Sequence, residues 1–99
     1  YFIENKQFKE ALRYYRRAVE LYPEDLNMHI NSAHMYLFTN EYAKAFDIYK
    51  AHLNDSVHPG LSWIDLLRGD YTFFKDNKYD MTMLDKVFTE LQLEKPKGK

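Results

Sequence analysis

Four histidines are the side chains of this sequence best suited to bind a metal ion, namely His29, His34, His52 and His58. Two histidines that hold a metal ion from one helix usually stand at positions i and i+4, on the same face. His29 and His34 are five residues apart and fall on different faces of a helix. We therefore expect structural or solvated roles for all four histidines and no metal site, with a pH-sensitive contact through His34 left open.

The other groups that enzymes use for catalysis show no arrangement that would do chemistry. The sequence has no cysteine, no phosphate-binding glycine loop and no nucleophile elbow. Core, loop and helix-capping positions account for Ser32, Ser56 and Ser62, and a turn accounts for the adjacent Glu24 and Asp25. The sequence therefore predicts a chain that is not an enzyme and that needs no cofactor.

The charged residues argue against a nucleic-acid partner and a membrane segment. Fourteen basic residues stand against 15 acidic ones, so no net positive charge attracts polyanions. One basic cluster comprises Lys9, Arg13, Arg16 and Arg17. Because Glu10 and Glu20 are interleaved with it, we interpret it as a solvated helix face. No apolar run approaches the roughly 20 residues that would span a bilayer.

The sequence begins at Tyr1, within what reads as the end of a helix, and is expected to be part of a longer protein. No targeting segment is recognised. The compartment is left open, with the cytoplasm slightly favoured.

Apolar residues recur at spacings of three and four, and only three Gly and three Pro occur, which predicts helices throughout and no sheet. Pro23 ends a first helix whose apolar stripe runs from Phe8 to Tyr22, and Asp25 caps a second helix from Leu26 to about Phe38. After a turn at Asn40, further helices are expected at 42–53, after a cap at Ser62, and after a cap at Asp80 or Thr82. Residues 54–60 read as a loop, and residues 95–99 as a polar tail.

A shift of the sequence by 34 residues places aromatic residues on aromatic ones and alanine on alanine. The matching pairs are Phe2 with Tyr36, Ile3 with Leu37, Phe8 with Tyr42, Ala11 with Ala45, Leu12 with Phe46, and Tyr15 with Tyr49. Such a period, with two helices in each unit, resembles the tetratricopeptide repeat (TPR) family. Ala18 and Pro23 extend the resemblance in the first unit.

The resemblance implies an all-α fold, in which antiparallel helical hairpins stack as a right-handed superhelix. Residues 1–57 would form TPR-like repeats, the first lacking its first helix; residues 58–95 would form a divergent capping hairpin and residues 96–99 a polar tail. Small residues at Ala11, Ala33 and Ala45 would let neighbouring helices approach closely.

The third unit departs from the family pattern after Trp63, which stands 34 residues beyond His29. Leu67, Asp70 and Tyr79 occupy the family's small, aromatic and alanine positions. Large side chains at the close-approach point should hold the last two helices farther apart or at another angle. Asp70 is expected to accept hydrogen bonds from the first amides of the last helix or from a tyrosine hydroxyl.

The resemblance also implies a concave groove, lined by the first helix of each hairpin, that binds a peptide or a partner protein. Carried over by position, the groove residues are Asn27, Ile30, Asn31, His34, Phe38 and Arg68, with Glu4 and Thr72 beside them. Some family members use an asparagine at the position of Asn31 to hold a peptide backbone or a terminal carboxylate.

Two other functions remain open. The hairpins could be a helical appendage that positions or regulates a catalytic or receptor domain elsewhere in a longer chain. The chain could also self-associate through the Phe2, Phe8 and Tyr15 side of the first hairpin, giving a homo-oligomer.

Overall fold

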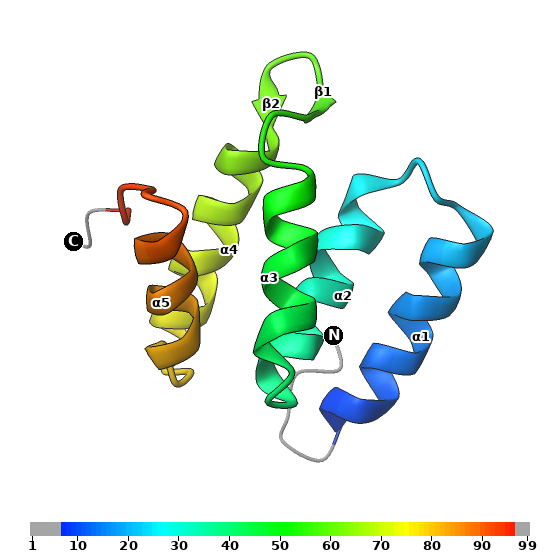
Figure 1. The fold of residues 1–99 in the computed structure, drawn as a ribbon, viewed down its shortest axis with the longest axis horizontal. Helices are drawn as coiled ribbons and strands as arrows, with labels where there is room; N and C mark the ends of the chain where they lie inside the picture. Colours follow the sequence, from blue (N-terminus) through cyan, green and yellow to red (C-terminus); the bar gives the residue numbers. More distant parts are fainter. Residues whose placement is uncertain (1–6, 97–99) are drawn as a thin grey trace. The chain divides into compact units, whose positions relative to one another are not determined.

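The computed structural model describes residues 7–96, and these residues are mostly helical, as predicted. The chain divides into two compact units, Tyr1–His52 (unit 1) and Leu53–Lys99 (unit 2). Among the described residues, unit 1 contains three helices, and unit 2 contains a short two-stranded ribbon followed by two helices. Figure 1 labels these elements along the chain. The elements are α1 (Phe8–Leu21), α2 (Leu26–Phe38), α3 (Tyr42–Ala51), β1 (Ser56–His58), β2 (Leu61–Ser62), α4 (Trp63–Asp76) and α5 (Thr82–Glu90). The predictions for Phe2, Ile3 and Glu4 lie outside the described residues.

The helix boundaries of unit 1 follow from local signals. Helix α1 ends at Leu21, two residues before Pro23, because proline disfavours a helical conformation at the residue before it. The side chain of Asp25 accepts a hydrogen bond from the Asn27 amide at 3.0 Å, which confirms the predicted cap of α2. Asn40 adopts the left-handed conformation, with φ of 65°, and reverses the chain between α2 and α3.

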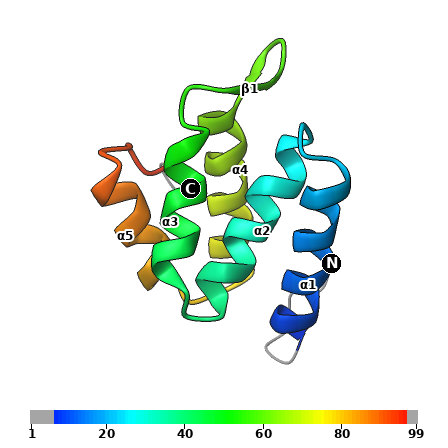
Figure 2. The same ribbon diagram turned by 45° about the vertical axis from the view of Figure 1, so that its right-hand side comes forward.

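The three helices of unit 1 run alternately in opposite directions and pack side by side, α1 on α2 and α2 on α3 (Figure 2). Ala11, Ala33 and Ala45 are each 0% exposed. This confirms the prediction that the alanines lie inside the packed helices. A methyl side chain lets two helix backbones approach closely, and larger residues fill the space around the contact.

One prediction at the helix ends of unit 1 is wrong. Tyr22, which was expected on the buried stripe of α1, is 58% exposed. The backbone leaves the helix at Tyr22, with φ of −133°, so the side chain no longer follows the helical period. Helix α3 ends at Ala51, close to the predicted end at about residue 53.

The prediction of no sheet is also wrong, because β1 and β2 of unit 2 form an antiparallel ribbon within residues 54–62. Ser56 pairs with Ser62 and His58 with Leu61. Pro59 and Gly60 make the turn, and Gly60 has φ of +92°, a conformation that glycine adopts without the steric cost of a side chain. The ribbon is too short to show an alternating apolar pattern, so sequence periodicity did not reveal it.

Helix α4 begins with the predicted cap. The Ser62 hydroxyl accepts a hydrogen bond from the Asp65 amide at 3.1 Å, and the Asp65 carboxylate accepts one from the Ser62 amide at 3.4 Å. This reciprocal pair is a capping box. At α5, the Asp80 carboxylate accepts a hydrogen bond from the Thr82 amide at 3.0 Å. Two hydrogen bonds from Thr82 lower the pKa of Asp80. The bond from the Thr82 side chain has the larger effect, and the bond from its backbone amide has the smaller one.

Helices α4 and α5 are antiparallel (Figure 1). Large side chains make a contact between them. The rings of Tyr71 and Phe88 lie with their centres 4.9 Å apart and tilted by 57°. The two backbones stay farther apart than those of α1 and α2 or of α2 and α3. This separation agrees with the wide spacing expected where large residues replace the small ones of the repeat.

Candidate functional site

Two of the six groove residues predicted on the first helices of the hairpins present polar groups to solvent. Asn27 is exposed and Asn31 is half-buried, and both belong to α2. They stand at positions i and i+4, so their side chains lie on the same face of the helix. A carboxamide both donates and accepts hydrogen bonds, so this pair can bind the backbone of an extended peptide.

Ile30 and His34 lie in the interior and are each 1% exposed, so the prediction that they contact a partner directly is not supported. A hydrogen bond of 2.6 Å joins His34 Nδ1 to the hydroxyl of Tyr49 on α3. The centres of the two rings are 5.6 Å apart. The hydrogen bond satisfies two polar groups that would be costly to bury unpaired. His34 therefore holds α2 against α3 within unit 1.

Phe38 is half-buried, and its ring stacks on that of Phe8, with centres 5.0 Å apart. Phe8 is itself buried, at 8% exposure. Self-association was predicted through the Phe2, Phe8 and Tyr15 side, and it stays a prediction; Phe2 lies outside the described residues and Tyr15 is half-buried. The rings of Phe8 and Phe38 pack where α1 begins and α2 ends. The repeat pattern alone did not reveal this contact.

Arg68 of α4 is half-buried and its side chain is engaged within unit 2. Its Nε donates a hydrogen bond to the backbone carbonyl of Glu94 at 3.2 Å. Thr72, one turn later, is exposed and its hydroxyl donates to the Arg68 carbonyl at 3.2 Å. A partner would have to displace the segment at Glu94 to reach this hydrogen-bonding group of Arg68.

The sequence predicted a solvated basic face on α1, but it did not reveal the large hydrophobic side chains that are exposed on the same helix. Tyr14 is 58% exposed and Leu21 is 56% exposed. Tyr14, Arg17 and Leu21 stand at positions i, i+3 and i+7 and share one face of the helix, and the exposed Tyr22 follows. We call these four residues the α1 surface. Tyr14, Arg17 and Leu21 lie outside the buried stripe of α1, and this spacing was the available signal for them. Tyr22 is exposed because the backbone leaves the helix there.

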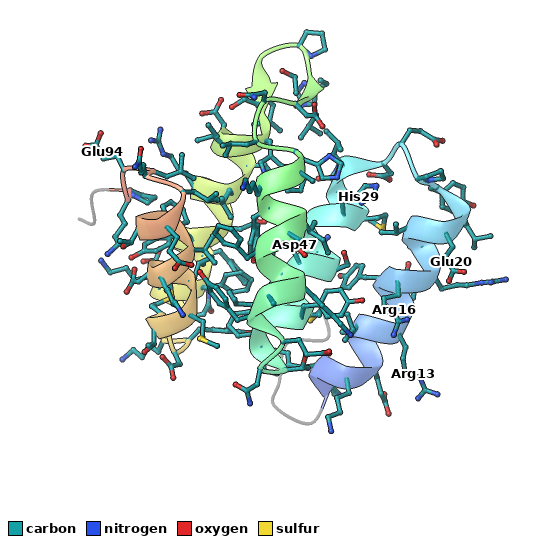
Figure 3. The ribbon with its side chains drawn as sticks, viewed as in Figure 1. Arg13, Arg16, Glu20, His29, Asp47 and Glu94 are labelled. Atoms are coloured by element: carbon teal, nitrogen blue, oxygen red, sulfur yellow. The ribbon has the colours of Figure 1, made fainter. Side chains whose placement is uncertain are left out.

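Basic side chains flank the α1 surface. Lys9, Arg13, Arg16 and Arg17 are all exposed, and Glu10 and Glu20 are the exposed acidic residues of the helix. Figure 3 labels Arg13, Arg16 and Glu20 along α1. With four basic residues against two acidic ones, this side of unit 1 favours anionic groups, in contrast to the balanced charge of the whole chain.

The histidines divide into different environments. His29 and His52 lie in contact, with ring centres 4.7 Å apart. His58 is exposed on β1, and its Nδ1 donates to the Pro59 carbonyl at 2.9 Å. Within residues 7–96 no group of three or more His, Asp or Glu side chains is arranged to hold a metal ion. The histidine contact joins residues 23 apart in the sequence, so helical spacing could not predict it.

A polar contact in unit 2 that the sequence did not predict joins Tyr71 to Asp85. The Tyr71 hydroxyl donates to Asp85 Oδ1 at 2.6 Å. Asp70 is half-buried, and its expected role as a hydrogen-bond acceptor stays a prediction. The pKa of Tyr71 is raised to about 12. Burial of the hydroxyl is the main cause, followed by its hydrogen bond to Asp85 and by the negative charge of that carboxylate. Lys95 Nζ lies 3.7 Å from the same Asp85 oxygen.

No protein-family model, curated protein or solved structure matches the chain. In the described part of the chain no helix has the length and apolar character required to cross a bilayer.

Proposed function

We propose that the chain is a protein–protein interaction module of TPR-like stacked helical hairpins that binds a partner protein or peptide and catalyses no reaction itself. The α1 surface is the observation that carries this proposal. Interface residues that contribute most to affinity are rich in tyrosine and arginine. Tyr14 and Arg17 combine these residue types beside Leu21 on one exposed face of α1, and the exposed Tyr22 follows the last residue of the helix.

The chemistry of the α1 surface favours a partner segment that is both acidic and apolar. Tyr14 and Leu21 would cover apolar side chains of the partner, and Arg13, Arg16 and Arg17 would bind carboxylates at the edges. Arginine suits this role because its planar guanidinium forms paired hydrogen bonds with a carboxylate. An acidic amphipathic helix meets both requirements.

A second copy of the chain is a poorer occupant of the α1 surface. In a two-fold symmetric dimer the same patch faces itself, so Arg13, Arg16 and Arg17 of two copies would be brought together. Like charges facing each other across an interface oppose binding. The excess of basic residues on α1 thus favours a different, acidic chain.

The α2 face would supply a second contact. The TPR resemblance implies that the first helices of the hairpins face the ligand, and Asn27 and Asn31 are the accessible candidates on α2. We propose that they bind peptide backbone, with affinity and charge selectivity coming mainly from α1. The function as a helical appendage of another domain is compatible with this proposal, since an appendage of this kind also acts by binding.

The proposal can be tested by selecting a displayed library of short random peptides on the 99-residue chain. We expect enriched peptides to carry Asp or Glu beside Leu, Phe or Trp. Synthetic copies of them should bind more weakly as the salt concentration rises, because exposed charges are screened. Enrichment of basic or purely polar peptides would contradict the proposal.

Matched variants locate the binding surface. Tyr14→Ser with Leu21→Ser, and separately Arg17→Glu, should weaken binding of the selected acidic peptides by about tenfold or more. Phe73→Ser and Lys75→Glu change an exposed aromatic and an exposed cation on α4, so they should leave binding unchanged. Equal losses in both sets of variants would show that the α1 surface is not the site. Sedimentation equilibrium at two concentrations would reveal a dimer, the outcome that favours self-association instead.

A further inference from the structure

His29 and His52 bring two imidazole rings together within unit 1. His29 lies in the first turns of α2, and His52 is the residue that caps the C-terminal end of α3. The ring centres are 4.7 Å apart and the rings are tilted by 43°. Both residues are half-buried. Figure 3 labels His29 at the end of α2 that follows the turn from α1.

The hydrogen bond of His29 determines which of its nitrogens carries a lone pair. Its Nε2 lies 2.6 Å from the backbone carbonyl oxygen of Pro23. A carbonyl oxygen only accepts hydrogen bonds, so Nε2 carries the proton and neutral His29 has its lone pair on Nδ1. Histidines that bind metals commonly donate the proton of the other ring nitrogen to a carbonyl in this way, which fixes the tautomer and the ring orientation.

We propose that His29 and His52 together bind a divalent first-row transition-metal ion of the kind that imidazole prefers, such as Cu²⁺, Ni²⁺ or Zn²⁺. Nitrogen ligands lie roughly 2.0–2.1 Å from such an ion, so the centres of two rings bound to it at neighbouring positions are about 4.5–5.2 Å apart. The observed separation of 4.7 Å falls within this range. Two protein ligands leave the other coordination positions to water.

A bound ion would join three parts of unit 1. His29 is tied through Pro23 to the turn between α1 and α2, and His52 stands at the end of α3. Since the unfolded chain would not hold these two imidazoles together, binding would stabilise the folded unit. This function is separate from peptide binding at the α1 surface, because neither histidine belongs to that surface.

The test uses the ¹⁵N-labelled 99-residue chain and CuCl₂. Paramagnetic Cu²⁺ broadens the amide resonances nearest to it, so the site can be located without any mutation. We expect less than one equivalent of Cu²⁺ to broaden the amides around His29 and His52 first. Broadening that is centred on His58 or on the N-terminal amine, or no broadening at one equivalent, would overturn the proposal.

Variants provide a second measurement. His29→Gln keeps a donor for the Pro23 carbonyl, and His52→Gln leaves His29 unchanged. Each should weaken binding of Ni²⁺ or Zn²⁺, measured by calorimetry, by about tenfold or more. His58→Gln is the control and should bind as the unaltered chain does. Circular dichroism confirms that each variant is folded, and undiminished affinity in a folded His52→Gln chain would refute the paired site.

Discussion

The hydroxyl of Tyr71 donates a hydrogen bond of 2.6 Å to Asp85 Oδ1 and so joins α4 to α5. The ring of Tyr71 also packs on Phe88, one turn beyond Asp85 along α5. One side chain therefore supplies both an apolar and a polar contact between two helices whose backbones are widely spaced. This explains how the last hairpin stays packed without the small residues of the repeat pattern.

Replacing Tyr71 with Phe should lower the free energy of unfolding by about 1–2 kcal/mol, because the ring contact remains while a hydrogen bond to a charged acceptor is lost. Urea unfolding followed by circular dichroism measures the change. Tyr22→Phe is the matched control, since the Tyr22 side chain is exposed, and it should have no effect. Equal stabilities of the two variants would mean that the bond to Asp85 contributes nothing.

The raised pKa of Tyr71 predicts a loss of stability at alkaline pH. The folded protein keeps the phenolic proton up to about pH 12, whereas an ordinary tyrosine has a pKa of 10.0. The contribution is therefore complete below pH 10.0 and disappears as the pH rises to about 12, where the folded-state group also ionises. The loss is at most about 3 kcal/mol. Tyr71→Phe should show a smaller fall in stability over the same interval, and identical pH profiles would argue against this assignment.

Ala45→Leu should lower the free energy of unfolding by about 1–3 kcal/mol, because the enlarged side chain overpacks a site without room. Ala45 is 0% exposed, whereas Ala43 on the same helix is exposed. Ala43→Leu should therefore change the stability by no more than about 0.5 kcal/mol. Thermal and urea unfolding of both variants compare them directly. A neutral Ala45→Leu would show that the helices of unit 1 do not meet closely at this residue.

Ser62→Ala should lower the free energy of unfolding by about 0.5–2 kcal/mol, because it removes the acceptor for the Asp65 amide in the first turn of α4. Hydrogen exchange should become faster at the Asp65 amide, which bonds to the Ser62 hydroxyl. Ser56→Ala, on the exposed strand β1, serves as the control and should leave exchange in α4 unchanged. Unaltered protection of Asp65 in Ser62→Ala would exclude the capping role.

Local chemistry made much of the fold predictable. Local effects that act within a few residues mark the helix ends at Pro23, Asp25, Asn40 and Ser62. The structure has a helix boundary within two residues of each. The alternation of small and large residues likewise predicted the burial of the alanines. The β ribbon escaped prediction because strands of two and three residues are too short to have a period.

The candidate site was harder to predict, because accessibility depends on what surrounds a residue rather than on its type. The TPR-like spacing led us to expect His34 on a binding face, yet the hydroxyl of Tyr49, 15 residues away, makes it an interior residue. Phe8, expected on an uncovered side, is buried against Phe38. In both cases the contact comes from a neighbouring helix.

The amino-acid sequence by itself determined that the chain is mainly helical, where most helices begin and end, and which alanines are enclosed. These properties depend on backbone hydrogen bonding and on a periodic division between apolar and polar residues, and both can be read along the chain. Only the tertiary structure decided that His29 meets His52, that Tyr71 bonds to Asp85, and that Tyr14 and Leu21 remain exposed. Such contacts join residues from separate helices, and they depend on the distance and rotation at which the helices pack.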